Sequence, residues 1–493
     1  YPCSGIELFK IGNITPLSPP GSKPSYTVYT NDEIDPINFE VPTVQVSYNG
    51  NGTAWMVKDI WSGNPDSNPE HLAAIGNTLY FGANDGINGL ELWKSDGTSG
   101  GTVMVKNINY GSGSGYPIYL TAVGNTLYFR ANDGPNGREL WKSDGTEEGT
   151  VMVKDIASGS GSSDPAYFAA VGNTLYFAAE DGTHGLELWK SDGTEEGTVM
   201  VKDINSGNGH SNPGYPVAFG NTLYFRANDG IHGHELWKSD GTEEGTVLVK
   251  DIFSGSNSGD TGHLAVVGNT LYFAADDGTN GHELWKSDGT EAGTMMVKDI
   301  VSGSNSSSPK HLVAVGNTLY FAADDGNNGY ELWKSDGTAS GTVMVKDINS
   351  GSSYSISHAD ASFTAVGNTL YFRANDGTNG FELWKSDGTE DGTMMVQDIW
   401  SGSNSGNPEH LEAVGNTLYF RADDDQDNGK ELWALDPANI TYDKKLEGTH
   451  WSISPSLPEG LTLDSKTGEI TGTPTEVMNL TDYKVTLSGI DPD

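Results

Sequence analysis

The chain has 493 residues and carries 67 Asp and Glu against 27 Lys and Arg, which leaves a formal net charge of -40. This excess of acid excludes most nucleic-acid partners and anionic membrane surfaces, because both are bound through clustered Lys and Arg. The 65 glycines indicate a turn-rich protein, while 35% hydrophobic and 10% aromatic residues still supply a core. No apolar stretch approaches the ~18 residues of a membrane span, so no membrane insertion is expected in this segment. The chain does not begin with Met and is expected to be a mature or excised segment.

Residues 1–53 form a segment shorter than an ordinary independent domain. They contain SYTVYTNDEIDPINFEVPTV from Ser25, which we interpret as short strands separated by turn residues. The first element of a longer pattern, MVKDI, follows at Met56.

Three strings then recur eight times each. ELW places its Trp at Trp93, Trp141, Trp189, Trp237, Trp285, Trp333, Trp384 and Trp433, at intervals of 48 residues except for one of 51 and one of 49. GNTLYF begins at Gly76, Gly124, Gly172, Gly220, Gly268, Gly316, Gly367 and Gly415, and MVKDI or a variant accompanies each copy. A fixed period in the forties indicates a repeat architecture.

Each period predicts four short strands. In the first copy these are residues 71–76, 78–83, 90–96 and 102–108, joined by Asn, Asp and Gly, which supply the positive φ of tight hairpins. Four antiparallel strands in 40 to 50 residues are typical of a β-propeller blade, with a solenoid as the alternative. Because blades stack face to face, consecutive apolar residues such as Leu79, Tyr80 and Phe81 are expected to be buried together.

The ends of the repeat predict how the ring closes. The first MVKDI precedes every other blade strand, and the last ELW has no MVKDI after it. We therefore expect residues 54–60 to supply the outer strand of the last blade, which removes two open sheet edges. The predicted fold is all-β, with an eight-bladed β-propeller over residues 54–436.

The last 57 residues, 437–493, hold WSISPSLPEGLTLDSKTGEITGTPTE from Trp451 and YKVTLSGI from Tyr483. They read as short strands punctuated by Pro and Gly. Together with residues 1–53 they are close in number to the ~100 residues of an immunoglobulin-like sandwich. We therefore expect residues 1–53 and 437–493 to form one split Ig-like domain, with the propeller inserted in one of its loops.

The ELW strings followed by SDGT and GT, as in residues 139–150, resemble the ELWxxDGTxxGT repeats of large bacterial and archaeal surface proteins. The stretch 451–476 resembles the putative-Ig, cadherin-like modules that accompany such repeats in extracellular adhesins. The resemblance implies an extracellular, cell-surface location. The last repeat departs from the pattern and reads ELWALDP. This difference fits a last blade that is followed directly by the sandwich.

Acidic loops between the second and third strands are the strongest chemical signal. Ca²⁺ takes 6 to 8 oxygen ligands, which clustered carboxylates and carbonyls can supply, so these loops are candidate calcium sites. Strand direction places them on the same face as Asp59 and its counterparts at the ends of the outer strands. The alternative is that Asn-Asp-Gly only makes the turn. The candidate residues are Asp85, Asp133, Asp181, Asp229, Asp277, Asp325 and Asp376, with Asp423, Asp424, Asp425 and Asp427 in blade eight as the best single site.

Other recurrent residues have structural interpretations. Glu91 of the first ELW is expected to pair across strands with Lys106 rather than to catalyse. Trp93 and its equivalents are expected in the core, whereas Trp55, Trp61 and Trp400 are better candidates for an exposed contact.

Two sets of basic residues vary from blade to blade. Arg130, Arg226, Arg373 and Arg421 follow LYF in four blades only, and we interpret them as solvated strand ends paired with nearby Asp. Four histidines open the inner strand and are expected as polar lining at the channel mouth, without zinc-binding spacing: His71, His263, His311 and His410.

These observations favour a non-enzymatic extracellular module that assembles with itself or with neighbouring surface-protein modules, as a fibre subunit or part of a longer surface protein. No GxSxG, Cys–His couple or phosphate-cradling loop is present. Two alternatives stay open. One is a calcium-dependent, lectin-like propeller that binds glycans. The other is a secreted hydrolase with its site in the channel, which would need one blade with unique paired carboxylates facing the axis.

Overall fold

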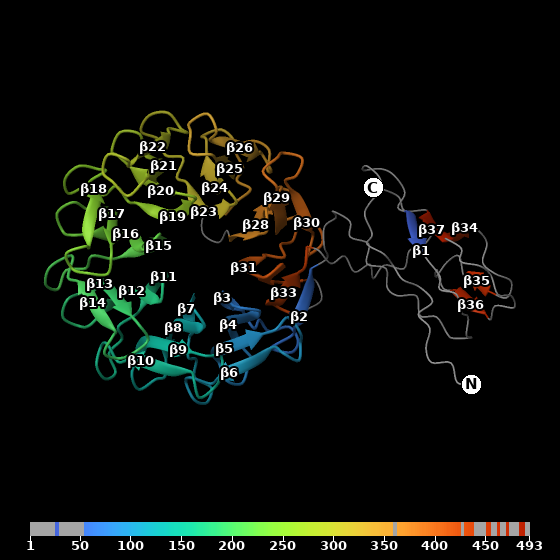
Figure 1. Ribbon diagram of the computed structural model, residues 1–493, viewed down its shortest axis with the longest axis horizontal. Coiled ribbons are helices and arrows are strands. Elements are labelled where there is room, and N and C mark those ends of the chain that lie inside the picture. Colours follow the sequence, from blue (N-terminus) through green and yellow to red (C-terminus); the bar gives the residue numbers. More distant parts are fainter. Residues whose placement is uncertain are drawn as a thin grey trace. The chain divides into compact units, whose positions relative to one another are not determined.

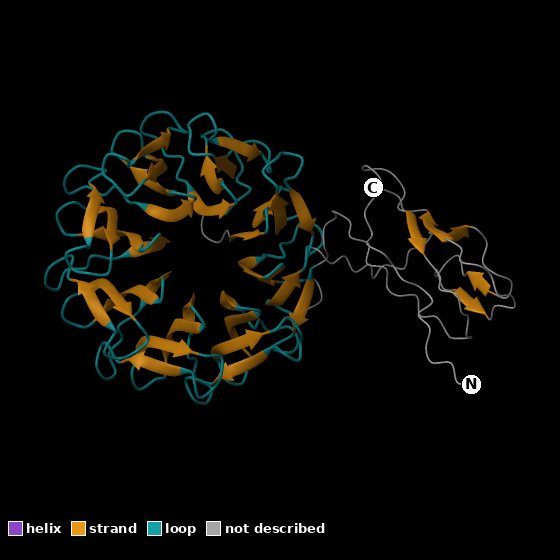
Figure 2. Ribbon diagram, viewed as in Figure 1, coloured by secondary structure: helices purple, strands orange, loops and turns teal. Residues whose placement is uncertain are grey.

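Eight four-stranded antiparallel sheets form a ring in the computed structural model (Figure 1). The structure describes residues 25–28, 54–357, 362–424, 428–437, 450–454, 461–463, 470–472 and 483–488. Within these ranges every regular element is a β-strand (Figure 2). The all-β, eight-bladed propeller predicted from the repeats is therefore confirmed.

Each blade contributes its strands in sequence order from the centre of the ring outward. Blade one comprises β3 (Glu70–Ile75), β4 (Thr78–Asn84), β5 (Leu90–Ser95) and β6 (Val103–Lys106). Blade two has β7 (Ile118–Val123), β8 (Thr126–Asn132), β9 (Arg138–Ser143) and β10 (Val151–Lys154). Blade three has β11 (Ala166–Val171), β12 (Thr174–Glu180), β13 (Leu186–Ser191) and β14 (Val199–Lys202). Blade four has β15 (Gly214–Phe219), β16 (Thr222–Asn228), β17 (His234–Ser239) and β18 (Val247–Lys250).

The second half of the ring repeats this order. Blade five has β19 (Gly262–Val267), β20 (Thr270–Asp276), β21 (His282–Ser287) and β22 (Met295–Lys298). Blade six has β23 (Lys310–Val315), β24 (Thr318–Asp324), β25 (Tyr330–Ser335) and β26 (Val343–Lys346). Blade seven has β27 (Phe363–Val366), β28 (Thr369–Asn375), β29 (Phe381–Ser386) and β30 (Met394–Gln397). Blade eight combines β31 (Glu409–Val414), β32 (Thr417–Ala422) and β33 (Glu431–Leu435) with β2 (Trp55–Lys58) from the start of the ring.

The core lies between blades. Leu79, Tyr80 and Phe81 are consecutive in β4 and yet are 1%, 7% and 0% exposed, because both faces of the sheet are covered. Tyr80 of blade one packs in one cluster with Leu127 and Phe129 of blade two. Burial of an aromatic or aliphatic side chain contributes about 1.5–3 kcal/mol, so these layers supply most of the cohesion of the ring.

The ring closes through its N-terminal strand, as expected. In blade eight β2 runs antiparallel to β33, with Trp55 opposite Ala434 and Met56 opposite Trp433. The junction between blades seven and eight, which we call the closing seam, differs from the other junctions between blades in one hydrogen bond. At seven outer strands a Lys donates to a carbonyl of the next blade, as Lys154 Nζ does to Thr198 O at 2.8 Å. At the seam Gln397 instead accepts a hydrogen bond from Ala54 N–H at 2.8 Å, because the next blade begins there with a backbone donor.

The two ends of the chain meet in a second unit. Contacts divide the chain into residues 50–438 and a unit formed by 1–49 with 439–493. In that second unit β1 (Ser25–Val28) pairs with β37 (Tyr483–Ser488), which pairs in turn with β34 (His450–Ser454). A separate hairpin joins β35 (Leu461–Leu463) and β36 (Ile470–Gly472). The sandwich boundaries at residues 53 and 437 stay a prediction.

Candidate functional site

A buried glutamate occupies each ELW motif. These eight side chains are 0% exposed: Glu91, Glu139, Glu187, Glu235, Glu283, Glu331, Glu382 and Glu431. The expected ion pair between Glu91 and Lys106 is wrong. A bulge in the outer strand places Lys106 opposite Leu92, and its Nζ donates to Thr150 O of the next blade at 2.9 Å. The carboxylate of Glu91 accepts hydrogen bonds from Ile108 N–H at 2.7 Å and Gly115 N–H at 2.8 Å.

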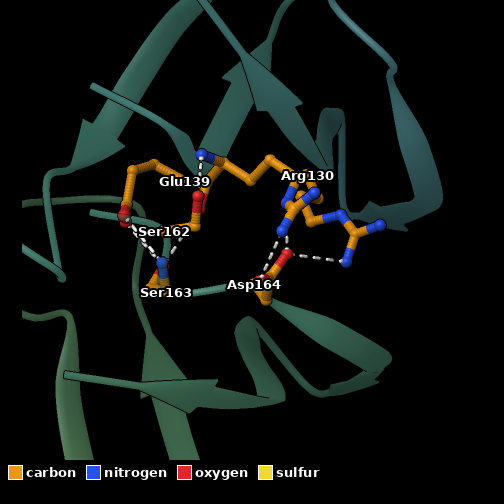
Figure 3. Close-up of polar contacts among 6 residues, drawn as sticks. Arg130, Glu139, Ser162, Ser163 and Asp164 are labelled. Carbon is orange, nitrogen blue, oxygen red and sulfur yellow. Dashed lines mark hydrogen bonds and ion pairs between the residues drawn. The ribbon is translucent and has the colours of Figure 1, made fainter. Parts of the chain in front are cut away.

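Blade two has the same arrangement, and Figure 3 shows the part of it that joins Glu139 to Ser163. Glu139 accepts hydrogen bonds from Ile156 N–H at 2.9 Å, Ser163 N–H at 2.9 Å and Ser163 Oγ at 2.6 Å. Each glutamate thus fixes the connection between the outer strand of one blade and the inner strand of the next. Burial raises the pKa of Glu139, although these hydrogen bonds oppose the rise. Burial raises the pKa to about 7 for Glu91, Glu235, Glu331, Glu382 and Glu431.

The ELW tryptophans belong to the core, as predicted. Trp93 is 7% exposed, and Lys58 Nζ of the preceding blade lies 5.8 Å from its ring centroid. Of the tryptophans outside this motif, Trp55 is 41% exposed at the outer rim, whereas Trp61 and Trp400 are half-buried.

The aspartates of the acidic loops organise their own turns. Asp85 Oδ1 accepts hydrogen bonds from Ile87 N–H and Asn88 N–H, and Oδ2 accepts one from Asn88 Nδ2. Burial favours a higher pKa for Asp85, but the hydrogen bonds from Asn88 and Ile87 outweigh it and hold the pKa below its usual value. The turn pattern recurs at Asp133, Asp181, Asp229, Asp277, Asp325 and Asp376.

These loops meet the ends of the outer strands. In blade one, Asn107 Nδ2 donates to Asn88 Oδ1 at 3.0 Å. In blade three, His184 Nδ1 lies 2.8 Å from Asp181 Oδ2, and the hydrogen bond and charge of Asp181, with a further contribution from Asp203, raise the pKa of His184. One buried side-chain oxygen without a hydrogen-bond partner lies at the outer-strand end of each blade, on Asp59, Asn107, Asp155, Asp203, Asp251, Asp299, Asp347 and Asp398.

Among the described residues, no three His, Cys, Asp or Glu side chains come together as metal ligands would. In blade eight Asn428 Nδ2 donates to both carboxylate oxygens of Asp424, and burial with the nearby charge of Asp66 raises the pKa of Asp423. Asp425 and Asp427 lie outside the described residues. Calcium binding stays a prediction.

A collar of aromatic side chains follows the inner strands. His71, His263, His311 and His410 were expected at the channel mouth, and they share a chain of ring contacts with three tyrosines. Successive centroids are 5.0–6.2 Å apart in the order His410, His71, Tyr119, Tyr167, Tyr215, His263, His311. In blade seven Ser362 takes the corresponding place, and its Oγ accepts a hydrogen bond from His410 N–H at 3.0 Å. Figure 1 shows the inner strands that carry these residues around the centre of the ring.

The backbone of the collar is strained. All seven ring-bearing residues have positive φ, between 50° and 57°, and each sits where a bulge interrupts the pairing of the first two strands. A bulged residue in this conformation is usually Gly, and a side chain there costs about 1–2 kcal/mol. Such strain clusters where structure serves binding or catalysis.

All five arginines of the chain gather beside the collar. Arg130 lies over the ring of Tyr119 at 5.4 Å and Arg226 over that of Tyr215 at 5.1 Å. Asp164 pairs with both Arg130 and Arg138 (Figure 3). In blade eight Glu409 pairs with Arg373 and Arg421. Arg130, Arg226, Arg373 and Arg421 are therefore at least partly buried rather than solvated, whereas Arg138 is exposed. The expected pairing with a nearby Asp is found for Arg130.

Sequence reasoning missed the three tyrosines. Aligning the repeats on GNTLYF places Tyr119, Tyr167 and Tyr215 in the column of His71 and His263, five residues before the motif. The histidines of that column were interpreted by themselves, as polar lining without zinc-binding spacing. The recurrence of an aromatic ring in seven of the eight blades is the signal that predicts the collar.

Blade eight carries two glutamates on its inner strand. Burial acts to raise the pKa of Glu409, but the hydrogen bond and charge of Arg421, with Arg373, hold it below the usual value. Burial raises the pKa of Glu412 to about 7. At the position of Glu412 the other blades have Ala, Thr or Val.

Comparison with known proteins identifies the C-terminal part. Residues 433–491 match the family model described as Putative Ig domain. No curated protein matches the chain. Similar solved structures include a puromycin hydrolase (13% identity, TM-score 0.43, covering 77% of this chain and 61% of that one) and oligopeptidase B from Leishmania major (11%, 0.45, 74% and 52%). A puromycin-hydrolyzing peptidase of Mycobacterium tuberculosis has 12% identity and a TM-score of 0.43, with coverage of 76% and 61%. The chain thus spans about half to three fifths of these proteins.

In the described part of the chain, no helix is long and apolar enough to cross a membrane.

Proposed function

We propose that this chain is a non-enzymatic, extracellular surface module that assembles with copies of itself or with neighbouring modules. The observation that carries the proposal is the combination of a closed propeller with an Ig-like module at its C-terminal end. The recurrent glutamates, which offered the most regular set of candidate catalytic groups, are occupied by backbone N–H groups that fix the blade connections.

The second unit supplies a means of assembly. Its three-stranded sheet has the order β1–β37–β34, so among the described strands β1 and β34 each pair on one side only. An edge strand presents unpaired N–H and C=O groups that can accept a strand from another chain. In blade eight β2 supplies the fourth strand, so β33 is paired on both sides and the ring is closed.

Electron microscopy of the purified full chain tests this proposal. We expect filaments or regular oligomers whose amount increases with protein concentration, because strand addition between chains follows mass action. Analytical ultracentrifugation over the same concentrations should show the matching rise in mass. Monodisperse single particles throughout, with and without calcium, would contradict assembly.

A hydrolase is the second candidate. Glu409 and Glu412 are carboxylates of one inner strand, and their pKa values are shifted in opposite directions, which is a pattern found in acid–base pairs. A panel of glycoside and peptide substrates, with Glu412→Gln as the matched variant, separates the two candidates. Turnover that disappears in Glu412→Gln would replace the non-enzymatic proposal.

A further inference from the structure

We propose that Tyr119, Tyr167, Tyr215 and Arg226, at the tyrosine side of the collar, bind a carboxylate-bearing saccharide. The site goes beyond the proposed assembly function and does not depend on it. It also differs from a calcium-dependent lectin site, because no residue of the acidic loops contributes to it.

Tyr167 provides the exposed stacking surface, and it lies between Tyr119 and Tyr215, whose rings each carry an arginine over one face. Tyr119 and Tyr167 have centroids 6.1 Å apart, and Tyr167 and Tyr215 have centroids 6.2 Å apart. Tyr167, in the middle, is 40% exposed. A tyrosine combines an apolar face, on which the C–H groups of a sugar ring can stack, with a hydroxyl that can hydrogen-bond to sugar hydroxyls.

The collar is not symmetric. Blades two, three and four contribute tyrosines, whereas blades one, five, six and eight contribute histidines. In all seven residues the backbone has positive φ at a bulge. The backbone therefore fixes the direction of the side chain before any ligand binds. Pre-organisation of this kind lowers the entropy lost on binding.

Arg226 supplies the charge for a carboxylate. Arg130, Arg138, Arg373 and Arg421 each have an acidic partner within 4 Å, but among the described residues no carboxylate lies that close to Arg226. Its Nε is buried without an acceptor, as are those of Arg130 and Arg421, so the missing carboxylate partner is what sets Arg226 apart. Opposite it stands Gly214, where a Cβ would lie 3.5 Å from a terminal guanidinium nitrogen, so the guanidinium packs against the glycine backbone without a clash. A guanidinium binds a carboxylate in two parallel hydrogen bonds.

The charges around the collar disfavour a cationic ligand. Burial, with the charge of nearby basic groups, lowers the pKa of His71, His263 and His410 to about 4, so these rings are neutral at pH 7. The cation–π position on Tyr119 and Tyr215 is already taken by arginine. A neutral saccharide would leave Arg226 without a counter-charge.

Isothermal titration calorimetry with the full chain provides the test. The probes are hexamers of galacturonate, glucuronate and mannuronate, the corresponding neutral hexose hexamers, and an octaglutamate peptide, all in the presence of EGTA. We expect at least one uronate hexamer to bind at least tenfold more tightly than its neutral counterpart. Absence of uronate binding at millimolar concentration, or equal binding of octaglutamate, would overturn the proposal.

Variants locate the site. Arg226→Gln should weaken uronate binding about tenfold and abolish the preference over the neutral hexamer, whereas Tyr167→Ala should weaken both about tenfold. Tyr167→Phe keeps the stacking surface and is expected to retain most of the affinity, which separates loss of contact from loss of fold. Trp55→Ala, at the outer rim, is the matched control and should bind as the unaltered chain does. Unchanged binding in both Arg226→Gln and Tyr167→Ala would place the ligand elsewhere.

Discussion

The buried glutamate of each ELW motif is held by backbone N–H groups and, in five blades, by a serine hydroxyl. Glu139, for example, accepts from two N–H groups and from Ser163 Oγ. A buried polar group that loses its partner costs about 1–3 kcal/mol. The carboxylate is therefore a structural acceptor, and its removal would leave several buried donors without a hydrogen-bond partner.

Replacing this acceptor should destabilise the ring strongly. Glu139→Ala is expected to lower the free energy of unfolding by about 3 kcal/mol or more, since it leaves two N–H groups and a hydroxyl without an acceptor. Thermal unfolding followed by circular dichroism measures the change. Glu148→Ala, at an exposed position in the next hairpin, should alter stability by at most about 0.5 kcal/mol. Equal effects of the two substitutions would show that the buried carboxylate is dispensable.

The same glutamates predict the pH dependence of stability. Burial raises the pKa of all eight above the ordinary 4.5, and to about 7 for Glu91, Glu235, Glu331, Glu382 and Glu431. The folded state therefore binds more protons than the unfolded state between these values. Stability from these groups is therefore full below pH 4.5 and is lost as the pH rises to 7. The collar histidines act in the opposite sense, because their pKa values near 4 lie below 6.5 and stability falls as the pH falls through that range.

The melting temperature should accordingly be higher near pH 6 than at pH 8, because more glutamates than histidines are involved. Scanning calorimetry between pH 4 and 9 checks this expectation. Replacing one glutamate by glutamine, as in Glu235→Gln, should reduce the difference between pH 6 and pH 8. A melting temperature that rises steadily from pH 6 to pH 8 would contradict the assignment.

At the scale of elements, one hydrogen bond distinguishes the closing seam from the other blade junctions. Gln397 accepts from Ala54 N–H, whereas a Lys donates to a carbonyl at the other junctions. A side-chain amide can donate or accept, but an ammonium group can only donate.

Exchanging the two side chains should therefore have unequal effects. Gln397→Lys is expected to cost about 1–2 kcal/mol, because Ala54 N–H is buried and loses its acceptor. Lys154→Gln should cost less, since the amide can still donate to Thr198 O. Chemical denaturation of both variants gives the comparison. A larger loss for Lys154→Gln would contradict this reading of the seam.

Calcium would act on the loops at one face of each blade. A buried Oδ1 without a hydrogen-bond partner lies at the end of each outer strand, on an aspartate in seven blades and on Asn107 in blade one. A cation that binds only the folded state raises its melting temperature. We expect a rise with millimolar Ca²⁺ relative to EGTA, and a smaller one with Mg²⁺, which demands stricter geometry. No rise with Ca²⁺ would rule out these loops as calcium sites.

Sequence predicted the elements better than the contacts. The repeat period, the four strands and the borrowed β2 followed from spacing and turn residues, because these are local signals. The partner of Glu91 did not, because a bulge one residue away shifts the outer strand and moves Lys106 opposite Leu92. The collar tyrosines were within reach of the sequence, because the repeat alignment places them in the column of His71 and His263, but their contacts with rings of neighbouring blades were not.

At the scale of the whole molecule, β2 decides whether the ring is closed. Met56→Pro should disrupt the pairing with Trp433, open the ring and expose the edge of β33. Met152→Pro breaks the equivalent pairing with Trp141 in blade two but leaves the closure intact. We expect the first variant to melt at a lower temperature and to form more soluble oligomers by size-exclusion chromatography. Identical behaviour of the two would show that closure adds nothing to the stability of one blade.

The pairing of β2 with β33 also determines how the ring would carry tension. The chain enters the ring at Ala54 and leaves it after Leu435, and Trp55 lies directly opposite Ala434. A pull on the two flanking segments would load these neighbouring strands at the same end, so their hydrogen bonds would separate one after another like a zipper. The other seven blades lie outside this path and would bear little of the force. Under load, β2 and β33 of blade eight would therefore separate before the other blades unfold. Their pairing would form again, and close the ring, when the load is released.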